Sequence, residues 1–140
     1  MIECRTMASP ERFDAFALMS SFRSDQAALG DALALFIERP DYGFVWLAYD
    51  DGVAAGCVSV AFAISTERGL TAELRDLWVD PEHRGRGIGS ALLATLRGRL
   101  AQLEVVRMEA VVPPDAGLRA LFALLGYAER GALAVTLDLR

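Results

Sequence analysis

Hydrophobic and polar residues follow two different spacings along this chain, and the spacing predicts where strands and helices lie. Alternation of apolar with polar or small residues predicts strands over residues 2–7, 43–49, 53–64, 71–79, 105–112 and 133–139. Apolar residues three or four positions apart predict helices over residues 10–22, 26–38, 88–103 and 116–125. The order β-α-α-β-β-β-α-β-α-β favours a mixed α/β fold without internal repeats.

Turn and cap residues mark the ends of several of these elements. Ser9 before Pro10 predicts the start of the first helix, and the pair Ser24-Asp25 is expected to cap the second. The run Asp50-Asp51-Gly52 predicts a hairpin turn between two strands. Gly126 is expected to end the last helix in the left-handed conformation.

The strand predicted over residues 53–64 has two different faces. Val58, Val60, Phe62 and Ile64 point one way, and the small residues Cys57, Ser59, Ala61 and Ala63 point the other way. The face of small side chains leaves room for a close neighbour, which is either a helix or a ligand.

The composition indicates one globular domain over residues 1–140. With 54% hydrophobic and 24% charged residues, the chain can build a core and does not resemble a disordered segment. Its net charge of −5 argues against a nucleic-acid partner and is compatible with a cationic amine as substrate.

The two cysteines, Cys4 and Cys57, have neither metal-binding nor disulfide spacing. We interpret them as buried thiols in a reducing compartment, which predicts a cytoplasmic protein that needs no metal. Residues 1–10 lack the apolar stretch of a signal peptide, and the run 53–64 is shorter than the roughly 20 residues that span a membrane. We therefore expect no membrane partner.

The most informative segment joins the predicted strand 71–79 to the predicted helix 88–103. An apolar run ends at Asp80-Pro81, and Arg84-Gly85-Arg86-Gly87-Ile88-Gly89-Ser90 follows. A glycine-rich turn before a helix exposes backbone N–H groups at the positive end of the helix dipole, and such a turn binds phosphate. Glycine allows the backbone to approach a ligand closely, and the two arginines add charge beside it.

Three patterns of phosphate-binding loop can be compared with this segment. A P-loop requires a lysine, and the chain contains none. A dinucleotide fingerprint requires a third glycine where Ser90 or Leu92 stands. The remaining pattern is R-x-x-G-x-G, with Arg84, Gly87 and Gly89 in register. It resembles the acetyl-CoA loop of the Gcn5-related N-acetyltransferase (GNAT) family, and the preceding L-W-V-D-P-E-H is similar to the lead-in strand of that family.

The resemblance covers residues 71–127 best and implies a fold as well as a cofactor. The implied fold is α/β (α+β), a single domain with a mixed, mostly antiparallel sheet, a central splayed parallel strand pair and helices on both faces. The implied co-substrate is acetyl-CoA, with its diphosphate on the amides of residues 84–90. Its pantetheine arm would pair with the edge of the preceding strand, where a backbone N–H near Val79 would polarise the acetyl carbonyl. The implied cofactor-binding residues are Leu77, Trp78, Val79, Arg84, Gly85, Arg86, Gly87, Ile88, Gly89, Ser90, Asp115 and Phe122.

Acetyl transfer to an amine also needs a base, because an alkyl amine is almost fully protonated at pH 7. Glu73 lies eleven residues before Arg84, where members of the family often carry a glutamate that acts through water. Asp76 is the second candidate. In an ideal pleat Glu73 shares a face with Arg75, and Asp76 lies opposite, unless a bulge separates the two. The alternative for Glu73 is a solvated carboxylate paired with Arg75 or Arg68.

Residues 115–127 resemble the family segment N-x-x-A-x-x-L-Y-x-x-x-G-[FY], with two departures. Asp115 replaces the asparagine, and Phe122 replaces the tyrosine that often protonates the leaving thiolate. A phenyl ring has no proton to give, so we expect a slower reaction and not a lost one, since a thiol of pKa about 8.5 leaves as thiolate. Tyr127 is interpreted as a packed aromatic residue and His83 as an exposed turn residue.

The sequence therefore predicts an acetyl-CoA-dependent N-acetyltransferase that acts on a primary amine, most simply that of a small molecule. Two alternatives remain open: a non-catalytic acyl-CoA sensor, suggested by Phe122, and a transferase acting on a protein lysine or N-terminus. A generic phosphate-binding domain is a further alternative. A homodimer through an edge strand or an apolar helix face is compatible with the sequence.

Overall fold

The structure, a computed structural model, describes residues 1–111, 116–130 and 137–138. Asp115 and most of the strand predicted over residues 133–139 lie outside these residues. The expectations for both therefore stay predictions.

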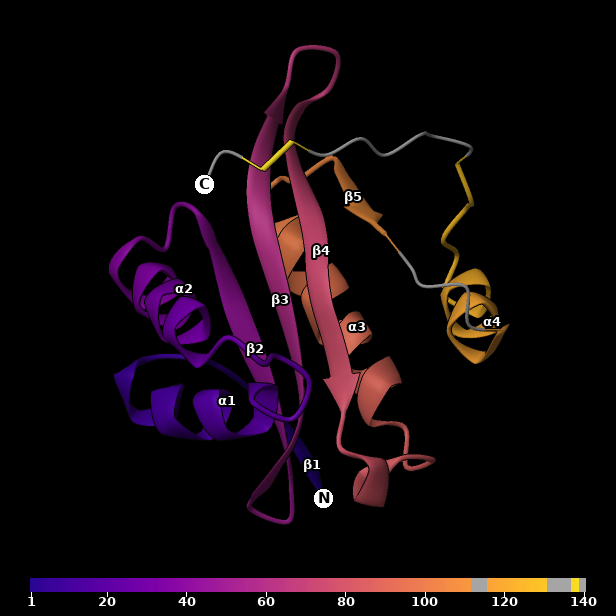
Figure 1. The fold of residues 1–140 in the computed structure, drawn as a ribbon. Helices are drawn as coiled ribbons and strands as arrows, with labels where there is room; N and C mark the ends of the chain where they lie inside the picture. The colour runs from indigo at the N-terminus through magenta and orange to yellow at the C-terminus, as the bar shows by residue number, and fades with distance from the viewer. Residues whose placement is uncertain (112–115, 131–136, 139–140) are drawn as a thin grey trace.

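Five strands of the described chain form one sheet (Figure 1). In sheet order they are β1 (Ile2–Thr6), β2 (Gly43–Asp50), β3 (Val53–Ser65), β4 (Gly69–Val79) and β5 (Arg107–Ala110). The first four pair in antiparallel fashion, and β5 runs parallel to β4. The mixed, mostly antiparallel sheet with a parallel pair confirms the predicted fold class.

Helices cover both faces of this sheet (Figure 1). On one face α1 (Arg12–Met19) and α2 (Gln26–Glu38) enclose a core with Leu47 and Cys57. On the other face α3 (Ile88–Gln102) and α4 (Ala116–Leu124) share a second core with Val58 and Val60. Alternate side chains of β3 therefore belong to the two different cores. The face of small residues packs against a helix, α1.

β4 and β5 pair over only part of their length. Their register runs from Thr71 opposite Arg107 to Leu74 opposite Ala110. β4 then continues to Val79, and within the described residues no strand pairs with this second half on the β5 side. An edge without a strand partner can pair with an extended ligand, although the Val79 carbonyl already accepts from Arg84 Nε.

Local signals of the sequence hold at most element ends. The Asp25 carboxylate accepts from the N–H of Ala28 at 3.0 Å and caps α2. The hairpin turn has positive φ at Asp51 (49°) and Gly52 (86°), as a two-residue turn of type I′ requires. Gly126, with φ of 91°, ends α4 as expected. Cys57 is buried as predicted, whereas Cys4 is partly exposed.

The prediction of Ser9 as a helix cap was wrong. The chain enters α1 through a short 3-10 helix, η1 (Ser9–Glu11), which is preceded by Ala8. The Glu11 carboxylate accepts from the backbone N–H of Ala8 at 2.9 Å. A side chain three residues further along therefore satisfies the N–H at this start.

Candidate active site

The glycine-rich turn leads from β4 through a 3-10 helix, η2 (Pro81–His83), to the start of α3. Gly85 and Gly87 have φ of 78° and 80°, which favours glycine over any residue with a Cβ. A Cβ built at either position meets nothing within 4 Å, so the space in front of the turn is open. No side chain caps α3 at Gly87. The first N–H groups of an uncapped helix lack partners, and this turn presents them together with the helix dipole to an anion.

Asp50 ties the turn to the end of β2. Its Oδ2 accepts from Arg86 Nη1 at 2.9 Å and lies 3.1 Å from His83 Nδ1. These two hydrogen bonds, that of His83 first, lower the pKa of Asp50. Asp50 is 8% exposed and holds the turn from a strand that is distant in the sequence. From the sequence, Asp50 was predicted only as part of a hairpin turn, because no local pattern links β2 to the glycine-rich turn.

Both arginines of the turn contact the protein. Arg86 pairs with Asp50, and Arg84 donates from Nε to the carbonyl oxygen of Val79 at 2.9 Å. The Arg84 guanidinium also lies over the ring of Trp78, 4.8 Å from its centroid. Both side chains remain exposed, so their charge stays beside the open space.

A bulge in β4 brings the two candidate carboxylates to one face. Ser59 of β3 lies opposite Asp76, whereas the next residue, Val60, lies opposite Leu74. Arg75 is therefore the extra residue. Leu74 and Leu77 consequently both face the α3 core. Glu73 and Asp76 then lie on the opposite face, which an ideal pleat would not allow.

Asp76 is held by two partners on the α1–α2 side. Its Oδ2 accepts from the buried hydroxyl of Ser59 at 2.5 Å, and its Oδ1 pairs with the Arg23 guanidinium. Arg23 comes from the connection between α1 and α2 and also stacks on Phe22. Burial of Cys57 and, to a smaller extent, the charge of Asp76 raise the pKa of this thiol to about 12. The thiol is therefore no nucleophile at neutral pH.

Glu73 has a different environment. Its carboxylate is exposed and lies 3.4 Å from Arg75 Nη1. The pairing with Arg75 is one of the two alternatives considered from the sequence. A long, exposed ion pair contributes little and leaves Glu73 accessible to water.

A cleft of about 190 Å³ lies where the β4 bulge faces the α1–α2 connection and α4. Its walls are formed by Phe22, Arg23, Leu74, Arg75, Asp76, Leu77, Val111, Leu118 and Phe122. We call it the β4 cleft. It lies beside the half of β4 that β5 leaves unpaired and reaches Asp76 but not Glu73. The edge of β4 predicted to bind pantetheine thus meets the connection between α1 and α2 at this cleft.

Phe122 is buried and lines the β4 cleft, whereas Tyr127 does not. The two rings meet edge to face with centroids 4.9 Å apart. Burial raises the pKa of Tyr127. Tyr127 is thus a packed aromatic residue, as predicted. His83 is not the exposed turn residue expected, because Asp50 holds its ring in a half-buried position.

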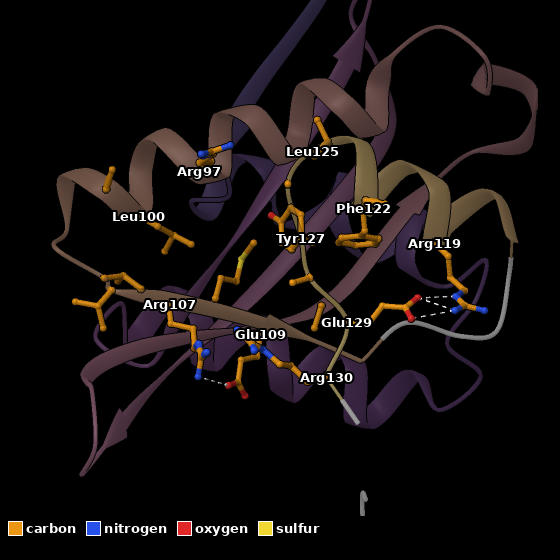
Figure 2. A pocket seen from close by; sticks show the side chains of 18 residues that line it. Arg97, Leu100, Arg107, Glu109, Arg119, Phe122, Leu125, Tyr127, Glu129 and Arg130 are labelled. Carbon is orange, nitrogen blue, oxygen red and sulfur yellow. Dashed lines mark hydrogen bonds and ion pairs between the residues drawn. The ribbon is translucent and has the colours of Figure 1, made fainter. Parts of the chain in front are cut away.

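A larger cavity, of about 870 Å³, lies between α3, β5 and α4 (Figure 2). Apolar side chains such as Leu100 and Tyr127 line it, together with the ion pairs Arg119–Glu129 and Arg107–Glu109 (Figure 2). Neither the glycine-rich turn nor the carboxylates of the candidate site contribute to its described lining, so we assign it no ligand.

Two properties of the described residues complete the picture. No cluster of three His, Cys, Asp or Glu side chains in that part of the chain is arranged to hold a metal ion. No helix there is both long and apolar enough to cross a bilayer.

Comparison with known proteins gives a family and a fold. A model of the acetyltransferase (GNAT) family matches residues 10–127. The chain is similar to an integron cassette protein from the Cole Harbour Salt Marsh metagenome (TM-score 0.87, 24% identity, covering 98% of this chain and 90% of that chain). It is also similar to the aminoglycoside N-acetyltransferase AAC(6')-Iy in complex with CoA (TM-score 0.87, 16% identity, 100% and 96% covered).

A third similar structure is the ribosomal-protein-alanine N-acetyltransferase of Brucella melitensis biovar Abortus 2308 (TM-score 0.81, 19% identity, 98% and 99% covered). At these identities the likeness is one of fold. No sequence among the curated proteins matches the chain.

Proposed function

The chain belongs to the acetyltransferase (GNAT) family, and from this premise we propose that it transfers acetyl from acetyl-CoA to the primary amine of a small molecule. The observation that carries the proposal is the open glycine-rich turn at the uncapped start of α3. It adjoins a half of β4 that lacks a strand partner on the β5 side in the described chain. The first feature suits a diphosphate and the second an amide-bearing arm.

The residues present fit acetyl-CoA. The amides of residues 84–90 would hold the diphosphate, because positive φ at Gly85 and Gly87 keeps the space before them free of side chains. The backbone of Leu77, Trp78 and Val79 would pair with the pantetheine arm. The side chain of Trp78 would not contact this arm, because it packs against Phe22 on the α1–α2 face of the sheet. Phe122 would pack beside the reacting end from the wall of the β4 cleft. Asp115 remains a candidate contact on the strength of the resemblance alone.

Acetyl-CoA supplies an activated thioester. The protein must bind the acceptor amine next to this thioester and remove its proton. We assign the two carboxylates different tasks. Asp76 borders the cleft and holds a cationic guanidinium there, and an acceptor ammonium could take the place of that guanidinium. Glu73 is exposed and weakly paired, which suits a base that takes a proton through water and passes it to solvent.

A general acid is not part of the proposal. Phe122 stands where the family often carries a tyrosine, and Tyr127 packs away from the β4 cleft. The leaving thiolate needs no full protonation near neutral pH, because a thiol of pKa about 8.5 is a moderate leaving group.

The test compares Gly87→Glu with Gly98→Glu in acetyl-CoA titration by calorimetry and in an amine screen that detects released thiol. Glutamate at 87 adds charge and bulk in front of the diphosphate amides, so we expect binding and turnover to disappear. Gly98 is an exposed position of the same helix where a Cβ meets nothing, so its variant should retain both.

Wild-type binding with no turnover on any amine would favour an acyl-CoA sensor, the reading that Phe122 suggests. Turnover on peptides alone would favour a protein acceptor. CoA affinity unchanged in Gly87→Glu would remove the turn from the cofactor site.

A further inference from the structure

The charges around the β4 cleft bear on the acceptor. Among the described residues that line the cleft, Asp76 is acidic and Arg23 and Arg75 are basic. Arg23 pairs with Asp76, and Arg75 lies at a long 3.4 Å from Glu73. In the described part of the cleft lining, basic residues therefore outnumber acidic ones, in a chain whose net charge is −5.

An acceptor ammonium must compete with Arg23 for Asp76. Arg23 is the movable partner, since its side chain is 53% exposed and lies on a connection between helices, whereas Asp76 is 17% exposed on a strand. Ser59, the other partner, is fixed inside the sheet. An amine that reaches Asp76 therefore displaces Arg23 and leaves its guanidinium without a counter-charge.

An anionic group on the acceptor resolves this imbalance. A carboxylate a few bonds from the amine can pair with the displaced Arg23, in the fork geometry that guanidinium and carboxylate share. Arg75 offers a second guanidinium at the same cleft, and its hold on Glu73 is weak. After the exchange, both Asp76 and Arg23 again have a counter-charge.

We propose that the acceptor is a small amine that also carries a carboxylate, an amino-acid-like molecule whose amine meets Asp76 and whose carboxylate meets Arg23 and Arg75. This inference rests on the proposed acetyl transfer. It also separates the chain from the aminoglycoside N-acetyltransferases that share its fold. An aminoglycoside carries several amines, mostly protonated at pH 7, and would bring further positive charge to two arginines.

The test uses matched pairs of acceptors with the wild-type protein and acetyl-CoA. The pairs are ω-amino acids of two to five carbons and their carboxamides, and neamine serves as a polycationic acceptor. For at least one of these chain lengths, we expect kcat/KM of the amino acid to be at least about tenfold higher than that of its carboxamide. We also expect it to be higher than kcat/KM of neamine. Calorimetric binding of each pair to the CoA-loaded protein gives a second readout that needs no turnover.

Variants test whether the arginines carry the preference. Arg23→Gln and Arg75→Gln should each reduce the ratio of acid to amide, and Arg23→Lys should restore part of it. Arg68→Gln, a change at an exposed turn residue, should leave the ratio unchanged. Melting curves of all variants establish that they fold.

The outcomes separate the two proposals. Equal use of acids and amides, or preference for neamine, would overturn the inference while acetyl transfer stands. Absence of turnover on every amine would contradict the proposed function, and the calorimetric ratio of acid to amide would then decide the inference. A preference that survives in both glutamine variants would show that other groups create it.

Discussion

At the scale of single residues, two carboxylates on one strand have different surroundings. The extra residue Arg75 places Glu73 and Asp76 on the same face, yet only Asp76 reaches the β4 cleft. Asp76 has Ser59 and Arg23 as partners, and Glu73 faces solvent. Two groups of the same chemistry can thus serve as binding group and base.

Substitution of each carboxylate by its amide should separate these tasks. We expect Glu73→Gln to lower kcat about 100-fold at pH 7, with the loss shrinking above about pH 9 as more of the amine is already neutral. Asp76→Asn should chiefly raise KM for the amine, by about tenfold. The measurement is a pH series of kcat and KM for both variants. A pH profile of Glu73→Gln parallel to that of wild type, with the pH effect in Asp76→Asn, would reverse the assignment.

Asp50 is the residue that connects the turn to the rest of the sheet. Since it holds both Arg86 and His83, Asp50→Asn should loosen the turn and weaken CoA binding about tenfold. Asp51→Asn is the matched control, because the Asp51 carboxylate pairs with the N-terminal amine at an exposed site. Equal CoA affinity of wild type and Asp50→Asn, measured by calorimetry, would argue against a positioning role.

The same carboxylate makes a pH prediction. His83 first and then Arg86 lower the pKa of Asp50 in the folded state, so its contribution to stability is complete above the unfolded value of about 3.9. That contribution is lost as the pH falls through the lower, folded value. We therefore expect the Tm of wild type to exceed that of Asp50→Asn at pH 7, and the difference in Tm to shrink as the pH falls below about 3.9. A constant difference in Tm across this range would contradict the assignment.

At the scale of elements, the position of α3 depends on a close contact with β3. A Cβ built on Gly56 of β3 lies 2.8 Å from Ile88 Cγ2, 3.1 Å from the carbonyl oxygen of Trp78 and 3.3 Å from Leu92 Cδ1. Ile88 is the first residue of α3 and follows the glycine-rich turn. The absence of a side chain at residue 56 lets the start of the helix sit against the sheet.

Gly56→Ala should therefore affect stability and cofactor binding together. Because the carbonyl of Trp78 cannot move without disturbing the sheet, we expect a loss of about 1–3 kcal/mol in the free energy of unfolding. CoA should also bind more weakly, as the first turn of α3 shifts. Denaturant titration and calorimetry measure the two effects. Gly98→Ala, with open space at its Cβ, should instead stabilise α3 by up to about 1 kcal/mol.

Element patterns predicted the structure well where both periodicity and burial were strong. Leu92, Leu96 and Leu100 of α3 are buried as their spacing indicated. The strand predicted over residues 105–112 is only Arg107–Ala110, because the chain leaves β4 after a short pairing. Phe13 of α1 is 80% exposed, although it lies in the segment whose apolar spacing predicted a helix.

At the scale of the whole molecule, two cores lie on opposite faces of one sheet. Val58 and Cys57 are neighbours in β3, yet each belongs to a different core. Because both cores pack on the same strands, unfolding of one core would remove the strands that bury the other core. The chain should consequently unfold in one step, with CoA raising the Tm of the whole domain.

The two tryptophans allow a test of this cooperativity. Trp46 packs in the core of α3, and Trp78 packs in the core of α1 and α2. In Trp46→Phe and Trp78→Phe, the remaining tryptophan reports on one core each. Within each variant, fluorescence and far-UV circular dichroism should give the same midpoint of unfolding. Separate midpoints would mean that one core opens first.

What the sequence determined by itself is local or periodic. Alternation and helical spacing depend on neighbours along the chain, so they predicted the order of elements, the two faces of β3 and the hairpin at Asp51-Gly52. The glycine-rich turn was also readable, because its backbone conformation and its place before a helix are properties of one short segment. A matching family model over residues 10–127 bears out the family that this segment suggested.

The tertiary structure decided what depends on contacts between distant segments. The bulge at Arg75 reflects the register with β3, and it alone puts Glu73 and Asp76 on one face. The hydrogen bonds from the glycine-rich turn to Asp50, and that from Arg23 to Asp76, each join residues more than 30 positions apart. Such contacts lower the free energy only after the chain has folded, so they leave no periodic or local trace in the sequence.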